Sequence, residues 1–218
     1  MRLLHRISEM LFPRKCVLCG TLLEKNELDL CTQCRVHGPE CPVKRTKLPF
    51  LDSWLAVWHY EGHVRGSLLR YKFHNKRHYA AAYGRLLSMK IAREREGQYD
   101  LITWVPISRV RKLRRGYDQV ELLAQAVCAE LQTEPVCCLR KIRHNPPQSG
   151  IVGQAQRRAN VLGVYEAVEP ERFRNQRILL LDDIITTGAT VGECARVLLT
   201  AGAKEVHCAA IAAAKSNK

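Results

Sequence analysis

Ile178-Leu-Leu-Leu-Asp182-Asp183-Ile-Ile-Thr186-Thr187-Gly188-Ala189-Thr190 is the stretch that decides the fold of this 218-residue chain. Its apolar run, which follows Arg177, is typical of a parallel strand that is buried on both faces. A turn rich in threonine and glycine comes next, and residues 190–201 then have helical spacing. We therefore predict a strand, a turn and a helix, with Asp182 and Asp183 at the carboxyl end of the strand.

This arrangement suits a sugar phosphate. Ligands of open α/β sheets bind at the carboxyl ends of the strands, and the unpaired N–H groups at the start of a helix suit a phosphate. Asp182 and Asp183 can accept hydrogen bonds from the vicinal hydroxyls of a ribose, and Gly188 lets the backbone close around the phosphate. Hydroxyl donors follow at Thr186, Thr187 and Thr190. The alternative is a strand–turn–helix with threonine caps and two solvated acids, but adjacent carboxylates after a buried strand are costly without a ligand or cation.

Strand-like and helix-like segments alternate on both sides of this stretch. We predict strands at 54–60, 100–105, 177–181 and 206–212, and helices at 64–73, 79–93, 117–131, 154–162 and 190–201. Such alternation favours a parallel sheet that is covered by helices. The first fifty residues differ, because they hold a cysteine cluster, many turn residues and little periodicity. We therefore expect an α/β domain at 51–218 and a small separate module at 1–50.

The cysteine cluster consists of two CxxC pairs, Cys16-Val-Leu-Cys19 and Cys31-Thr-Gln-Cys34, with eleven residues between them. Four soft ligands in two short turns are what tetrahedral zinc requires. An iron–sulfur cluster and redox thiols are the alternatives, and His37 and Cys41 are close enough to be spare ligands. A closed zinc site would fold a segment that is too small for a core of its own.

Composition points to a soluble protein of a reducing compartment. Ten cysteines without a secretion signal favour metal binding over disulfides, and hence a cytoplasmic location. No run approaches the roughly 18 apolar residues that a membrane span needs. Residues 1–15 are interrupted by charges, and we expect a short helix there that docks on the core, with membrane contact as the alternative. The remaining cysteines are expected to be buried as small apolar residues: Cys128, Cys137, Cys138, Cys194 and Cys208.

The chain is strongly basic, with 35 Lys and Arg against 21 Asp and Glu and a formal charge of +14. Such a surplus favours anionic partners, namely nucleic acid, phosphorylated metabolites or acidic lipid heads. A basic run lies just after the predicted strand at 100–105, and Tyr117 follows it. Arginines with an aromatic neighbour can follow a single nucleic-acid strand by charge and stacking, whereas the alternative is a solvated face. The cations expected to contact phosphates are Arg111, Lys112, Arg114, Arg115 and Arg157.

Residues 178–190 resemble the phosphoribosyl-pyrophosphate loop of type I phosphoribosyltransferases. The resemblance implies that Asp182 and Asp183 bind the ribose hydroxyls, and that Mg²⁺ accompanies the ligand. The turn that would wrap the 5-phosphate consists of Thr186, Thr187, Gly188, Ala189 and Thr190. Val105-Pro106-Ile107-Ser108-Arg109 falls where those enzymes place the loop that contacts pyrophosphate, which implicates Ser108 and Arg109.

Three further segments resemble the ComF family of competence-related proteins. Arg114-Arg115-Gly116-Tyr117-Asp118-Gln119 is similar to its RRGFNQ box, with Tyr and Asp in place of Phe and Asn. Gln148-Ser149-Gly150, followed by Ile151 where Leu is usual, and residues 157–163 are similar to its QSxL and RxxN segments. With the cysteine module, the resemblance spans nearly the whole chain.

Membership of the ComF family implies a role in natural transformation and DNA uptake, with single-stranded DNA handled on the cytoplasmic side together with partner proteins. The rival hypothesis is an active phosphoribosyltransferase that acts on a base or amine. A third hypothesis is a sensor of phosphoribosyl pyrophosphate that is coupled to nucleic acid. The residues leave open whether transferase activity is retained.

Overall fold

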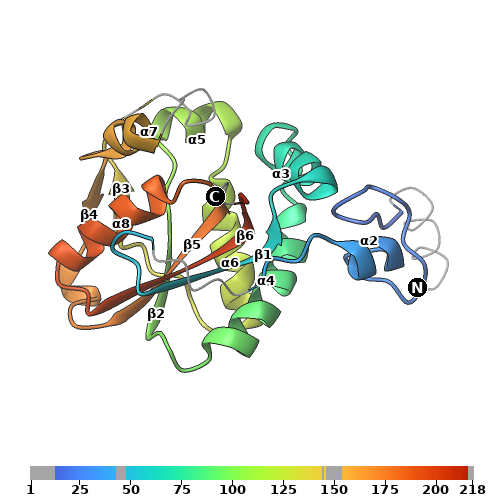
Figure 1. Ribbon diagram of the computed structural model, residues 1–218, viewed down its shortest axis with the longest axis horizontal. Coiled ribbons are helices and arrows are strands. Elements are labelled where there is room, and N and C mark those ends of the chain that lie inside the picture. The colour runs from blue at the N-terminus through green and yellow to red at the C-terminus, as the bar shows by residue number, and fades with distance from the viewer. Residues whose placement is uncertain (1–12, 43–47, 144, 146–153, 216–218) are drawn as a thin grey trace.

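Four parallel strands form the central sheet of the computed structural model, which describes residues 13–42, 48–143, 145 and 154–215 (Figure 1). Their order across the sheet is β1-β6-β5-β2. The bounds are β1 Ser53–His59, β2 Leu101–Trp104, β5 Arg177–Ile185 and β6 Glu205–Ala213. All four predicted strands are confirmed, and so is the parallel pairing.

Strand β5 lies between β6 and β2 and is buried on both faces. Leu179 and Leu181 belong to the apolar cluster on one side of the sheet, and Ile178 and Leu180 belong to the cluster on the other. This burial is the reason why the strand is continuously apolar rather than alternating.

The end of β5 differs from the prediction. We expected the strand to stop at Leu181, but it continues to Ile185 because Asp182 to Ile185 still pair with β6. Strand β2 ends earlier, with Trp104 paired to Leu181. Asp182 and Asp183 therefore lie inside a strand whose neighbour on one side has already ended, which opens the sheet next to them.

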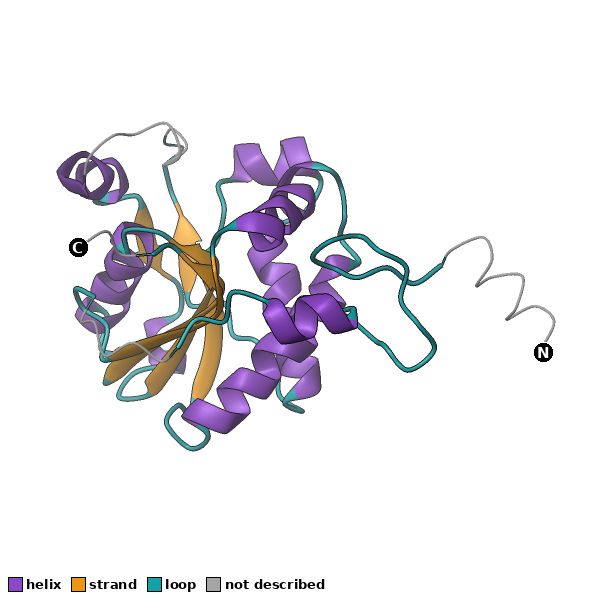
Figure 2. Cartoon of the chain, turned by 45° about the vertical axis from the view of Figure 1, so that its right-hand side comes forward, coloured by secondary structure: helices purple, strands orange, loops and turns teal. Residues whose placement is uncertain are grey.

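Helices cover both faces of this sheet (Figure 2). Three pack on one side: α3 Gly62–Phe73, α4 Tyr79–Arg95 and α6 Gln119–Glu130. Helix α8 Ala189–Thr200 packs on the other side. The predicted helices at 64–73, 79–93, 117–131 and 190–201 are thus confirmed to within a few residues. The sheet with helices on both faces is the predicted α/β arrangement.

Several short elements were not predicted from the sequence. Strands β3 Leu139–Lys141 and β4 Tyr165–Ala167 form an antiparallel ribbon beside the main sheet, and α5 Arg109–Arg115 contains the basic run. A 3₁₀ turn, η2 Pro170–Arg172, precedes β5, whereas α7 Gln154–Val161 matches the prediction at 154–162. Three-residue strands are too short for a periodic pattern, and α5 has no apolar face that would mark it as a helix.

The cysteine module packs directly on α3 and α4. It contains helix α2 Thr32–His37, and its Val17 and Leu18 join the apolar cluster that also includes Leu68 of α3. Asp29 of the module pairs with Arg85 of α4, with an Nη2–Oδ1 distance of 2.6 Å. The division at 50/51 into two domains stays a prediction, and the helix expected within 1–15 falls mainly on residues 1–12, outside the described part.

The burial of the five scattered cysteines can be compared with the prediction. Cys128, Cys138, Cys194 and Cys208 are buried as predicted, but Cys137 is exposed, because it lies in the loop just before the short strand β3. Within the described ranges, no helix combines the length and the apolar character that crossing a membrane demands.

Candidate ligand cavity and cysteine cluster

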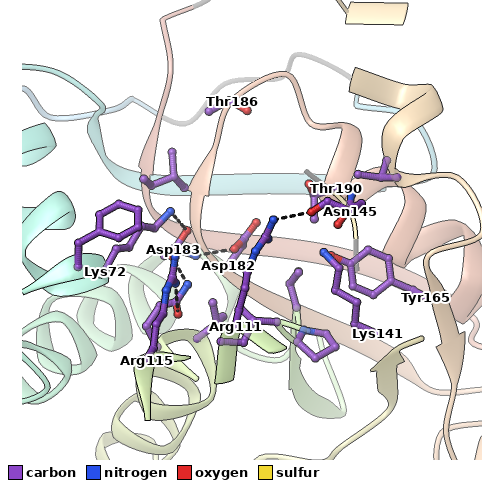
Figure 3. Close-up of a pocket in the computed structure, with 18 of the residues that line it drawn as sticks. Lys72, Arg111, Arg115, Lys141, Asn145, Tyr165, Asp182, Asp183, Thr186 and Thr190 are labelled. Atoms are coloured by element: carbon purple, nitrogen blue, oxygen red, sulfur yellow. Dashed lines mark hydrogen bonds and ion pairs between the residues drawn. The ribbon is translucent and has the colours of Figure 1, made fainter. Parts of the chain in front are cut away.

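A cavity of about 410 Å³ opens at the carboxyl ends of β2 and β5 (Figure 3). Its wall is built from β5, α3, α5, α6, α8 and the β3–β4 ribbon, together with the loop after β2. The predicted site residues that line it are Asp182, Asp183, Thr186, Thr190, Arg111 and Arg115. The early end of β2 leaves this space next to β5, so the cavity lies where ligands of parallel sheets are usually bound.

Asp183 is buried and fully engaged by polar neighbours. Its Oδ1 lies 2.9 Å from Lys72 Nζ, and its Oδ2 accepts a 3.1 Å hydrogen bond from Gln119 Nε2. Gln119 is itself held by Arg115, whose Nη1 donates to Gln119 Oε1 at 2.7 Å. An ammonium and an amide thus hold this carboxylate in a fixed orientation.

Asp182 is in a different electrostatic situation, although it is adjacent. Burial, and next the negative charge of Asp183, raise the pKa of Asp182 well above its usual range. Its Oδ1 accepts a 2.8 Å hydrogen bond from the backbone N–H of Asp183. The two carboxyl groups resist ionising together, so hydroxyl donors or a cation from a ligand would stabilise the charged form.

The cavity wall also contains cations. Arg111 is half-buried, and its Nη2 donates a 2.7 Å hydrogen bond to the carbonyl of Asn145. Burial, and then the charge of Arg111, lower the pKa of Lys141 to about 8. The ammonium of Lys141 lies 3.3 Å from the hydroxyl of Tyr165 and 5.1 Å from the centre of its ring. A cavity that contains both carboxylates and cations suits a ligand that carries both hydroxyls and phosphates.

The turn after β5 has the shape that its sequence predicts. Gly188 has φ +77°, and a Cβ atom there would lie only 2.6 Å from Cδ2 of Leu48, so the position requires glycine. Thr187 Oγ1 accepts a hydrogen bond from Ala189 N at 3.4 Å. Thr186 and Thr190 both line the cavity, and Thr186 is also exposed. Thr187, Gly188 and Ala189 belong to the turn but do not line the cavity themselves.

Helix α5 divides the basic run into two sets. Arg111 and Arg115 line the cavity, whereas Arg109, Lys112 and Arg114 are exposed outside it. Lys112 is paired with Glu121, with Nζ and Oε2 2.6 Å apart. Ser108 is buried and caps α5 by accepting a 3.4 Å hydrogen bond from Arg111 N. Arg157 lies on α7, but its side chain is outside the described part of the chain.

Asp118, where the ComF box usually has Asn, is the N-cap of α6. Its Oδ1 accepts from the N–H groups of Val120 and Glu121 at 2.9 and 3.2 Å, and its Oδ2 accepts from Ile107 N at 2.9 Å. Asn and Asp are about equally good in this role. The substitution therefore leaves the cap, and the loop that it holds, intact.

Sequence reasoning did not assign several residues of the cavity wall. Lys72, Lys141 and Tyr165 belong to α3, β3 and β4 and have no motif around them. Gln119 stands inside the ComF box, so the box itself was the available signal for that residue.

The four predicted cysteine ligands do come together. The sulfurs of Cys16, Cys19, Cys31 and Cys34 all lie within 4.8 Å of one another, and those of Cys19 and Cys31 are 3.6 Å apart. A tetrahedral zinc ion with Zn–S bonds of about 2.3 Å separates its sulfurs by about 3.8 Å. The cluster can therefore hold one zinc ion. The expected spare ligands, His37 and Cys41, are not part of this four-sulfur group.

Helix α3 connects the cysteine cluster to the cavity. The carbonyl groups of Val17 and Leu18, between the first two cysteines, accept hydrogen bonds from Ser67 Oγ and from Arg70 Nη2, the latter at 2.6 Å. Two residues after Arg70, the same helix supplies Lys72 to Asp183. Both sites are thus attached to the C-terminal half of one helix.

Parts of this chain are similar to known proteins. Residues 114–218 match the family model described as "Phosphoribosyl transferase domain". Among solved structures, the allosteric regulatory enzyme of purine biosynthesis is similar at a TM-score of 0.41 and 22% identity, and the match covers 66% of this chain and 30% of that chain.

Curated relatives are similar over most of their length. Competence protein F of Haemophilus influenzae is 30% identical over 90% of this chain and 95% of its own. "DNA utilization protein YhgH" of Salmonella typhimurium is 29% identical over 88% and 87%. Competence protein ComFC of Streptococcus pneumoniae is 27% identical over 88% and 96%. The chain therefore belongs to the ComF family of competence-related proteins and has a phosphoribosyltransferase-type core preceded by a cysteine module.

Proposed function

We propose that this protein acts in DNA uptake on the cytoplasmic side, where it binds a phosphoribosyl ligand in the cavity and single-stranded DNA on its basic surface. The names of its relatives, which refer to competence and DNA utilization, support the process. The observation that supports the ligand is the buried pair Asp182–Asp183 in a cavity that Arg111 and Lys141 also line.

Each chemical group of this ligand would have a counterpart among the residues of the site. Ribose hydroxyls would donate to Asp182 and Asp183, and a 5-phosphate would meet the N–H groups and hydroxyls of residues 186–190. A pyrophosphate would lie by the loop after β2, next to Ser108 and Arg109 at the start of α5. Mg²⁺ is usually held by one or two carboxylates together with substrate phosphates, so it would enter with the pyrophosphate.

Calorimetry with phosphoribosyl pyrophosphate and Mg²⁺ tests the ligand. The double variant Asp182→Asn/Asp183→Asn should lose at least about tenfold in affinity, which corresponds to about 1.4 kcal/mol. Its thermal stability should stay equal or rise, because burial and the charge of Asp183 disfavour ionisation of Asp182. Asp100→Asn, which removes a carboxylate from the opposite end of β2, should leave affinity unchanged. Undiminished binding by the double variant would refute this site.

The DNA half of the proposal rests on the charge of +14 and on the exposed cations of α5. The unmodified protein should bind oligothymidylate without sequence preference, and binding should weaken steeply with salt as counterions are released. Fluorescence anisotropy at several salt concentrations measures both properties. Absence of binding at low salt would remove this half and favour a purely enzymatic role.

An active transferase is the second candidate. Tyr60 and Phe73 line the cavity and offer aromatic surface on which a planar base could stack. Release of pyrophosphate from phosphoribosyl pyrophosphate, measured with a panel of bases and amines, tests this activity. Release with one acceptor would establish a transferase, whereas ligand-dependent DNA affinity without release would favour a sensor.

A further inference from the structure

A second hollow, of about 580 Å³, lies on the outer side of the ribbon and α5. We call it the basic groove. Its lining residues are Ser108, Arg109, Val110, Arg140, Lys141, Ile142, Arg143 and Glu166. Lys141 lines both the groove and the ligand cavity, so one side chain separates the two spaces.

Arg143 is held in place by the backbone after α7. Its Nε donates to the carbonyl of Gly163 at 3.0 Å, and its Nη2 donates to the carbonyls of Gly163 and Leu162 at 2.6 and 3.0 Å. Gly163 has φ +63°, and a Cβ atom there would lie 2.7 Å from Nη2 of Arg143. The positive φ favours glycine at this position, and a side chain there would displace the end of the Arg143 guanidinium group.

Positive charges outnumber negative charges in the groove. Arg140 is paired with Glu166 across the ribbon, whereas Arg109 is exposed on α5. Four cations thus face a single carboxylate. Val110 and Ile142, which are 56% and 50% exposed, add apolar surface between the charges. A row of cations interleaved with apolar patches suits a chain of phosphates that carries flat apolar groups.

The two spaces favour different ligands. Asp182 and Asp183 suit a sugar with free vicinal hydroxyls, and in a DNA strand the 3′-oxygen is esterified to the next phosphate. That phosphate would be repelled by the carboxylate pair, whereas the basic groove presents mainly cations. An internal stretch of a strand therefore fits the groove and not the cavity.

We propose that the basic groove is the path of single-stranded DNA across this protein. The inference rests on the proposed DNA binding and adds its location, which is next to the ligand cavity. A strand in the groove would pass Lys141, which lines both spaces, and Ser108 and Arg109, so the two ligands would be neighbours whose sites meet at these residues.

The double variant Arg140→Ala/Arg143→Ala tests this path. Arg109 and Lys141 stay intact because they adjoin the proposed phosphoribosyl site. Oligothymidylate binding should weaken, and the log–log salt slope should decrease in magnitude by about 1.4, since each lost contact with a single strand contributes about 0.7. The matched control Arg174→Ala/Lys204→Ala removes two exposed cations that precede β5 and β6 at the other end of the sheet. The control should keep the slope.

A second variant should strengthen DNA binding, which misfolding could not do. Glu166→Gln removes the carboxylate of the groove and frees Arg140 from its partner. It should tighten oligothymidylate binding and steepen the slope by up to about 0.7.

The outcomes separate the path from the proposed function. If the unmodified protein binds DNA but the Arg140/Arg143 variant behaves like its control, the path is wrong and the DNA binding stands. If that variant, while folded, also loses phosphoribosyl pyrophosphate, the groove belongs to the small-ligand site and the inference is overturned. Equal binding of a polyglutamate peptide, with the same loss in the variant, would assign the groove to acidic proteins and would also overturn it.

Discussion

The cysteine cluster and the carboxylate cavity are built on opposite principles within one chain. The four sulfurs come from a segment of 19 residues, Cys16 to Cys34, and two short turns bring them together. The cavity wall draws on residues from Tyr60 to Thr190, which only the packed sheet and helices bring together. A site whose ligands are close in sequence is held together by its metal. A site whose residues are distant in sequence is held together by the packed core.

These two regions also meet. Ser67 and Arg70 hold the backbone between Cys16 and Cys19, and Lys72 on the same helix contacts Asp183. The comparison therefore predicts a one-way dependence: loss of the cysteine site should disturb the cavity through α3. Loss of the carboxylates should leave the cysteine site unaffected.

Removal of metal ligands should have the largest effect. The unmodified protein should contain about one zinc per chain by elemental analysis, and Cys16→Ser/Cys19→Ser should contain none. Structural zinc supplies about 10 kcal/mol or more of folding free energy in isolated fingers, so hydrogen exchange over residues 13–42 should accelerate strongly.

The exposed Cys137 gives the matched control, because Cys137→Ser should retain zinc and protection from exchange. A purified protein without metal, or with iron and visible absorbance, would contradict the zinc assignment. It would also break the comparison, because a metal-free module would have to be folded by its packing on α3 and α4 alone.

Cutting the link between the regions should have an intermediate effect. Arg70→Ala removes the hydrogen bond to Leu18 O while leaving all four cysteines in place. We expect zinc content to stay at about one per chain and affinity for phosphoribosyl pyrophosphate to fall about tenfold, or about 1.4 kcal/mol, because α3 would hold Lys72 less firmly.

Arg65→Ala is the control for this link, since Arg65 is exposed on the same helix. Unchanged affinity in Arg70→Ala would mean that α3 positions Lys72 without help from the cysteine module. The two regions would then be independent.

Titration of Lys141 should give the smallest effect and sharpen the description of the cavity. Burial and the charge of Arg111 lower the pKa of Lys141 to about 8, so its positive charge is present below that pH and is lost above it. Affinity for an anionic ligand should therefore fall as pH rises, by about fourfold between pH 7 and pH 8.5 if only the protonated amine binds.

Lys141→Arg should bind with nearly constant affinity over this range, because a guanidinium stays charged. Calorimetry at matched ionic strength measures both proteins. An equal decline in Lys141→Arg would show that another group is responsible for the pH dependence.

Features that leave a pattern among neighbouring residues were predicted correctly from the sequence. The apolar run before Asp182 predicted a buried parallel strand, the two CxxC pairs predicted a four-sulfur cluster, and 3.6-residue spacing located α3, α4, α6 and α8. In each case neighbours along the chain carry the signal, because burial on two faces, metal ligation and helical amphipathicity all leave a short-range pattern.

The remaining features were decided by tertiary structure. Lys72, Gln119 and Lys141 stand near Asp182 and Asp183 because three separate elements converge where β2 ends before β5 does. The division of the basic run into cavity and exposed residues depends on how α5 packs. The basic groove also depends on this packing, because residues of α5 and of the β3–β4 ribbon line it together. Contacts between distant segments leave no local periodicity, so the sequence determined the elements and their motifs, while packing determined which charges face one another.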